Sequence, residues 1–192
     1  MPLASLYSLV VLAVLLGAQI MRPFCVRRQA TSDKYDRIFK YGFLISTFFV
    51  LFVPGYLTFQ QYRVWKASAL SQLLLPPHQP IGYFIQYSIA HFWTAPLIAF
   101  AMALIALVAA KLLNKKFQER FFWPAEPWLF ATGILLTGHP GWMYYTTALF
   151  AALLVSGFRF QVSRNTERRL SFYWLWLPVA IGVILIEIAN RV

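Results

Sequence analysis

Acidic residues are scarce in this chain of 192 residues, which has 6 Asp and Glu against 17 Lys and Arg. Only 12% of the residues are charged, whereas 60% are hydrophobic, and the mean hydropathy is +0.61. A soluble domain of this size has too little interior to bury so much apolar surface. The shortage of charge therefore excludes an ordinary soluble fold and predicts a membrane protein.

Cysteine is almost absent, since Cys25 is the only one. A single cysteine excludes an intrachain disulfide and a cysteine-rich metal site. The chain also lacks a glycine-rich phosphate loop, a His-Glu-x-x-His motif and a Gly-x-Ser-x-Gly motif. Most enzyme classes with a readable signature are therefore unsupported, and the sequence leaves the identity of any cofactor open.

The net charge of +11 would suit a nucleic-acid partner if the basic residues shared one polar face. Instead, fourteen of the 17 basic residues fall within 22–40, 111–126 and 159–169, between apolar runs. Short loops rich in Lys and Arg stay in the cytoplasm. We therefore predict that these three segments are cytoplasmic, that both termini lie outside, and that no nucleic acid is bound.

Long apolar runs between the basic segments determine the predicted fold. A bilayer is crossed by about 20 apolar residues in a helix. The runs are 3–21, 41–59, 81–110, 127–158 and 170–189. With 127–158 crossing twice, they predict an all-α, polytopic bundle of about six transmembrane helices. We expect a single domain over 1–192 in a bacterial inner membrane, with the lipid bilayer as its surroundings.

The run 127–158 is too long for one span and is interrupted by Gly138-His139-Pro140-Gly141. Proline lacks an amide donor and glycine accepts turn geometry, so this tetrapeptide breaks a helix. Basic segments flank the run on both sides, so both of its ends belong on the same side of the membrane. The sequence predicts a helical hairpin with His139 at its far tip.

Residues 60–75 alternate apolar and polar side chains at helical spacing, with Trp65 on the apolar face. A segment with an aromatic face and few charges is typical of a helix that lies in the membrane interface. Pro54-Gly55 kinks or ends the span before it, and Pro76-Pro77 ends the segment itself. We therefore predict one interfacial amphipathic helix here.

His91, His139 and Glu187 fall toward the outer side of this topology, on three different elements. Ionisable groups at membrane depth are costly, so each is a functional candidate. Together they could bind a metal ion, relay protons, or act as base and acid. A plainer interpretation stays open: histidines near helix ends reach water cheaply, and Glu187 can pair with Arg191 four residues on.

Carboxylates on the cytoplasmic side form an alternative catalytic set, consisting of Glu126 with Asp33 or Asp36. Both aspartates stand among basic residues, a pattern that is also typical of a solvated charged turn.

Glu126 to Gly157, with the Gly-His-Pro-Gly turn, resembles the later hairpin of the prepilin-peptidase membrane fold. Arg169-Leu170-Ser171-Phe172-Tyr173 resembles the start of that family's last helix. The family's inner Gly-x-Gly-Asp is replaced here by Trp123-Pro124-Ala125-Glu126. The resemblance implies aspartyl chemistry by two cytoplasmic carboxylates, one of which would be a glutamate in this chain.

Small size, many aromatic residues and the absence of catalytic signatures favour a non-enzymatic role. We predict an integral subunit or assembly factor of a larger envelope complex, of secretion, conjugation or respiratory type, with protein partners in the membrane. One alternative is an intramembrane enzyme that acts on lipid or peptide through one of the two residue sets. Another is a small transporter, because broken helices often line transport sites.

Overall fold

The computed structural model describes residues 3–25, 30–117, 122–162 and 174–190, and the regular structure of these residues is entirely helical. The α-helices are α1 (Leu3–Cys25), α2 (Ala30–Ala67), α3 (Ile81–Ser88), α4 (Thr94–Lys116), α5 (Glu126–Thr137), α6 (Gly141–Val162) and α7 (Trp176–Ala189). A 3₁₀ turn, η1 (Ser71–Leu74), precedes α3, and a π-helical turn, η2 (Ile89–Trp93), joins α3 to α4. The predicted all-α class is confirmed.

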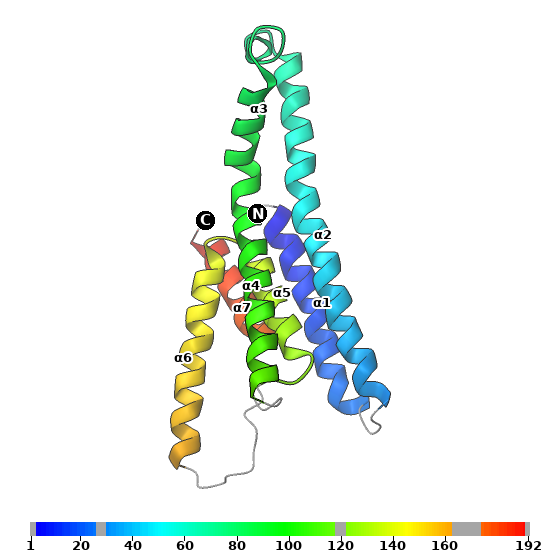
Figure 1. The fold of residues 1–192 in the computed structure, drawn as a ribbon, viewed down its shortest axis with the longest axis vertical. Coiled ribbons are helices and arrows are strands. Elements are labelled where there is room, and N and C mark those ends of the chain that lie inside the picture. Colours follow the sequence, from blue (N-terminus) through cyan, green and yellow to red (C-terminus); the bar gives the residue numbers. More distant parts are fainter. Residues whose placement is uncertain (1–2, 26–29, 118–121, 163–173, 191–192) are drawn as a thin grey trace.

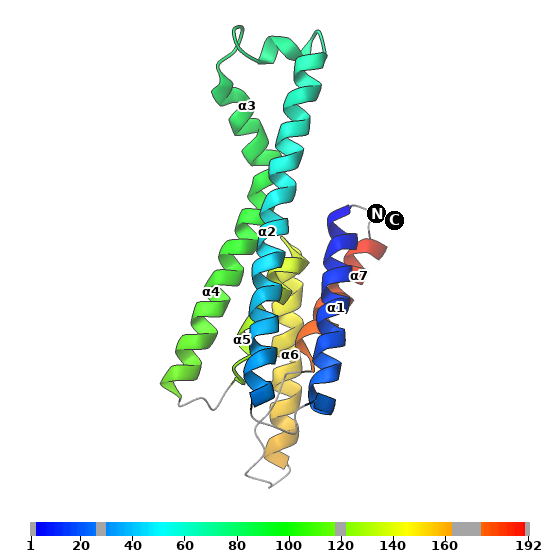
Figure 2. The ribbon, with the colours of Figure 1, turned by 90° about the vertical axis from the view of Figure 1, so that its right-hand side faces the viewer.

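The helices form two regions (Figures 1 and 2). α1, the first part of α2, α4, α5, α6 and α7 lie together as a bundle, and the chain from 58 to 93 extends beyond it as the projecting hairpin. Both termini lie at the end of the bundle from which this hairpin leaves, whereas α1, α4 and α6 end at the opposite side. Helix ends next to the basic segments thus gather at one end of the molecule.

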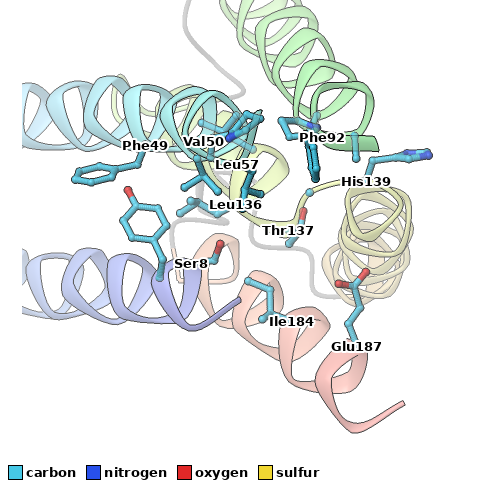
Figure 3. A pocket seen from close by; sticks show the side chains of 18 of the residues that line it. Ser8, Phe49, Val50, Leu57, Phe92, Leu136, Thr137, His139, Ile184 and Glu187 are labelled. Carbon is cyan, nitrogen blue, oxygen red and sulfur yellow. The ribbon is translucent and has the colours of Figure 1, made fainter. Parts of the chain in front are cut away.

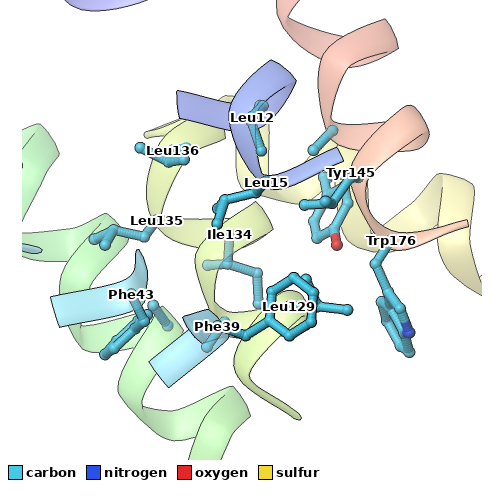
Figure 4. Packing of buried hydrophobic residues seen from close by; sticks show 14 of the residues in the cluster. Leu12, Leu15, Phe39, Phe43, Leu129, Ile134, Leu135, Leu136, Tyr145 and Trp176 are labelled. Atoms are coloured by element: carbon cyan, nitrogen blue, oxygen red, sulfur yellow. The ribbon is translucent and has the colours of Figure 1, made fainter. Parts of the chain in front are cut away.

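Helix α5 lies at the centre of the bundle, in contact with α1, α2, α4, α6 and α7. All of its residues except Trp128 and Phe130 are buried. Figure 4 shows α5 side chains among residues from the surrounding helices; the labelled ones are Leu12, Leu15, Phe39, Phe43, Leu129, Ile134, Leu135, Leu136, Tyr145 and Trp176. A helix that is apolar on every side is typical of an enclosed position. The low polarity of α5 is therefore explained by its packing against the neighbouring helices.

The predicted helical hairpin at Gly138–Gly141 is confirmed, because α5 ends at Thr137 and α6 begins at Gly141. Gly138 has φ 69° and ψ −174°, a conformation that is essentially reserved for glycine. The amide of Trp142 donates a hydrogen bond to the Gly138 carbonyl oxygen at 2.8 Å, which starts the new helix. The breaker therefore acts where the sequence indicated.

The predicted interfacial helix at 60–75 is wrong, because α2 continues without interruption through buried Pro54 to Ala67. Its aromatic face is covered by α3 instead of by lipid. The ring of Trp65 lies 5.3 Å from that of Phe84 and 4.9 Å from that of Tyr87, measured between centroids. The amphipathic pattern was real, but its apolar side packs inside the projecting hairpin.

Two described helical stretches are long and apolar enough to cross a membrane, Arg37–Ala67 and Ile81–Lys116. Two shorter apolar stretches are Leu6–Ile20, which lies inside α1, and Trp176–Ala189, which is α7. α5 has 12 residues, a length of about 18 Å against a hydrocarbon layer of about 30 Å. The structure thus supports two candidate spans where the sequence predicted six, because apolar runs do not reveal where each helix begins.

Candidate functional site

A cavity of about 300 Å³ lies where α1, α2, α4, α5 and α7 meet, at the base of the projecting hairpin (Figure 3). Its walls are mostly apolar, with Leu57 from α2, Leu136 from α5 and Ile184 from α7 among them. The volume is at the lower end of the roughly 300–1,000 Å³ that is common for small-molecule sites. The cavity is therefore large enough for part of a small amphiphile.

The three outer residues singled out in the sequence all line this cavity. His91 comes from η2, His139 from the tip between α5 and α6, and Glu187 from the last turn of α7. These elements are far apart in the chain, and packing around α5 brings them to one cavity. We call the part of its wall formed by these three residues the rim. The contacts of each side chain define what this rim can donate and accept.

His91 is exposed and is held by Tyr87, one helical turn earlier in α3. Its Nδ1 lies 2.9 Å from the Tyr87 carbonyl oxygen, and the two rings stack with centroids 4.0 Å apart. A carbonyl oxygen can only accept, so Nδ1 must carry the hydrogen. In the neutral ring Nε2 is then an acceptor.

His139 is exposed as well, and its ring extends outward at the rim (Figure 3). The indole Nε1 of Trp142 donates a hydrogen bond to its Nδ1 at 3.3 Å. An indole N–H can only donate, so Nδ1 is unprotonated and Nε2 carries the hydrogen. The two histidines therefore present opposite Nε2 groups, an acceptor on His91 and a donor on His139.

Glu187 is half-buried, and its carboxylate turns toward the start of α6 (Figure 3). A Cβ atom at Gly141 would stand 2.7 Å from its Oε1 and 3.2 Å from its Cδ. The first turn of a helix carries partial positive charge, which favours a carboxylate there. Gly141 thus allows a close approach that any side chain would obstruct. The predicted partner Arg191 lies outside the described residues.

A shared metal ion does not fit this arrangement. Within 3–25, 30–117, 122–162 and 174–190, no three His, Cys, Asp or Glu side chains come close enough to hold one. His91, His139 and Glu187 therefore line the cavity without forming a metal-binding group.

The alternative carboxylate set lies at the opposite end of α5. Glu126 is 0% exposed, and its Oε2 accepts a hydrogen bond from the amide of Trp123 at 3.2 Å. A carboxylate at a helix start stabilises that helix through its unpaired amides. Asp33 and Asp36 belong to the first turns of α2, but their side chains lie outside the described part of the structure.

Most lining residues escaped the sequence analysis, among them two with small hydroxyl side chains, Ser8 of α1 and Thr137 of α5. The Thr137 hydroxyl donates to the carbonyl oxygen of Gly133 at 2.8 Å, inside its own helix. Small hydroxyl residues in apolar helices usually bond to their own backbone, so their type alone gives no signal. The position of Thr137 directly before the Gly138 breaker was the available clue.

Comparisons with known proteins found no matching family model, no matching curated protein and no matching solved structure. The likeness to the prepilin-peptidase hairpin therefore rests on the quoted residues alone.

Proposed function

We propose that this chain is a multi-pass protein of a bacterial inner membrane, with three basic cytoplasmic segments and both termini outside. In an apolar 18-residue stretch of each of the two candidate spans, only 17% and 22% of the residues are buried. The core helix of a soluble protein would be mostly covered, whereas lipid can face an exposed apolar helix. The two candidate spans lie in α2 and in the continuous stretch of α3, η2 and α4, whereas α5 is shorter than the hydrocarbon layer and is enclosed by its neighbours.

Within that membrane, we propose a non-enzymatic integral subunit or assembly factor of a larger envelope complex. The projecting hairpin carries this proposal. α1 and α4 each have 23 residues, about 34 Å of helix, which matches a bilayer. α2 runs from Ala30 to Ala67, and its part beyond the cytoplasmic segment, residues 41–67, is about 40 Å long, so roughly 10 Å of it extends beyond the hydrocarbon layer on the outer side.

The surface of this hairpin is apolar although it extends outside the layer. Phe59, Val64 and Leu70 keep 58%, 59% and 82% of their surface exposed. Apolar area in water is unfavourable, and such patches mark interaction sites. The charged residues of 58–93 are basic, Arg63 and Lys66. The occupant that fits is an apolar helical surface of another envelope protein, bordered by acidic residues.

Site-specific photocrosslinking in intact membranes tests this partner. Crosslinkers at Val64 and Ile85, both exposed on the projecting hairpin, should give one adduct of defined mass, purified in fixed ratio with the chain. A crosslinker at Phe150, exposed on α6 in the bundle, is the matched control and should label lipid. Lipid adducts alone at Val64 and Ile85 would mean that the hairpin lies on the bilayer and has no protein partner.

A second candidate is an intramembrane enzyme that acts on lipid or peptide, favoured by the opposite Nε2 groups of the two histidines. His91 would accept a proton as general base, and His139 would donate one as general acid. His91→Gln and His139→Gln should then each abolish turnover of a bound substrate. Unchanged turnover in either variant removes this candidate and leaves the subunit role intact.

A further inference from the structure

We propose that the cavity is a phospholipid site, which takes part of one acyl chain and binds at its rim the headgroup of a lipid with a primary ammonium group, such as phosphatidylethanolamine. The proposal is independent of the subunit role, because it concerns a ligand that the isolated chain would bind. Three features of the cavity support it: the apolar walls, the opening at the outer surface of the bundle, and the polar side chains of the rim.

The walls suit an acyl chain. Side chains from α1, α2, α4, α5 and α7 line the cavity, and most of them are apolar. Phe49 and Val53 line it as well and remain exposed on α2, so the cavity reaches the outer surface of the bundle. In the proposed orientation lipid lies against that surface. An acyl chain can therefore enter sideways, and burial of its methylenes contributes most of the binding free energy.

The rim suits a zwitterionic headgroup. The Glu187 carboxylate and the His91 Nε2 are both acceptors, and a primary ammonium has three N–H donors for them. The His139 ring extends outward (Figure 3), so its Nε2–H is a donor for a phosphate oxygen that lies outside the cavity. Among the described residues no three His, Cys, Asp or Glu side chains are grouped to hold a metal ion, so the proposed cation is an organic one. Phosphatidylglycerol lacks the ammonium, and phosphatidylcholine has no N–H to donate.

Native mass spectrometry of the purified full chain tests the headgroup without any substitution. The protein is equilibrated with phosphatidylethanolamine, phosphatidylcholine and phosphatidylglycerol that carry identical acyl chains. Retention of phosphatidylethanolamine should exceed that of the other two by about tenfold, the size of one hydrogen bond to a charged group. Equal retention of the three lipids overturns the headgroup assignment. Competition by free phosphoethanolamine as strong as by the whole lipid overturns the acyl-chain assignment.

Two variants then locate the site. Glu187→Gln should remove the preference for phosphatidylethanolamine and leave the retention of phosphatidylglycerol unchanged. Ala95→Trp places an indole in the cavity lining and should lower retention of every lipid, whereas Ala101→Trp, on an exposed position outside the lining, should not. Equal lipid retention by the two tryptophan variants, at unchanged melting temperature, overturns the cavity as the site. Should Glu187→Gln fail to fold, the three-lipid comparison on the unaltered chain decides the headgroup.

Discussion

The bundle and the projecting hairpin use the same kinds of residue in opposite ways. In the bundle, α5 is enclosed by five helices, and even its polar residues Glu126, Thr132 and Thr137 are buried. In the projecting hairpin a small cluster of Trp65, Leu75 and Phe84 is the buried core, and many apolar side chains stay exposed. Apolar composition alone therefore does not distinguish a packed core from an exposed apolar surface. The number of neighbouring helices distinguishes them.

The cavity lies at the border between the two regions. The lining includes His91 and Phe92 of the projecting hairpin, and Pro54 and Leu57 of α2 directly before it. The Trp93 indole N–H donates to the Thr58 hydroxyl at 3.1 Å, which ties α2 to η2 directly above it.

The largest expected difference between the regions comes from truncating a leucine in each. Leu129→Ala removes a side chain that is 0% exposed at the centre of the bundle and should cost about 2–5 kcal/mol of unfolding free energy. Leu70→Ala, at the tip of the hairpin, should change it by less than about 0.5 kcal/mol. Equilibrium unfolding in detergent measures both. Similar losses at the two positions would show that the tip is covered.

The next effect tests the close packing of α5 against α6. A Cβ at Gly133 would stand 2.9 Å from Cε1 of Tyr145 and closer still to its hydroxyl. Gly133→Ala should therefore cost about 1–3 kcal/mol through overpacking. The Tyr145 hydroxyl is buried and has no hydrogen-bond partner among the described residues, so Tyr145→Phe should recover part of that loss. Purely additive effects in the double variant would speak against direct contact.

A pair of glycines gives opposite signs in the two regions. Gly138→Ala forces a side chain into φ 69° at the end of α5 and should destabilise the bundle by about 1–3 kcal/mol. Gly82→Ala in α3 meets no atom within 4 Å and should stabilise the helix by about 0.5–1 kcal/mol. Thermal melting with helix-specific amide exchange distinguishes the two. Stabilisation by Gly138→Ala would contradict the hairpin geometry.

The smallest effect on the bundle is expected from the core of the hairpin. Trp65→Ala removes ring contacts to Tyr83, Phe84 and Tyr87 and should speed amide exchange in α3. The melting temperature of the bundle should stay within about 2 °C, because none of the described hydrophobic residues of the bundle packs against this cluster. Faster exchange that also spreads through α5 would mean that the two regions unfold together.

The sequence predicts which residues form the candidate site better than it predicts their hydrogen-bonding chemistry. The alternation of basic and apolar segments placed His91, His139 and Glu187 toward one side, and the structure lines a single cavity with them. The tautomers of the two histidines depend on Tyr87 and Trp142, three or four residues away, but only in a helical backbone of known geometry. The contact between Glu187 and Gly141 joins helices that are distant in sequence, so no local pattern indicated it.

Features that depend on local chemistry could be predicted from the sequence: the all-α class, the apolar runs and the break at Gly138–Gly141. At that break proline lacks an amide donor, and glycine alone tolerates the backbone angles. Tertiary packing decided the rest. α2 continues past Pro54 because α3 covers the face that the sequence assigned to the membrane interface. α5 is central because five helices enclose it. It is short because it begins only at Glu126 and ends at the Gly138 break. Both outcomes depend on which neighbour covers an apolar face, and a pattern along one segment does not contain that information.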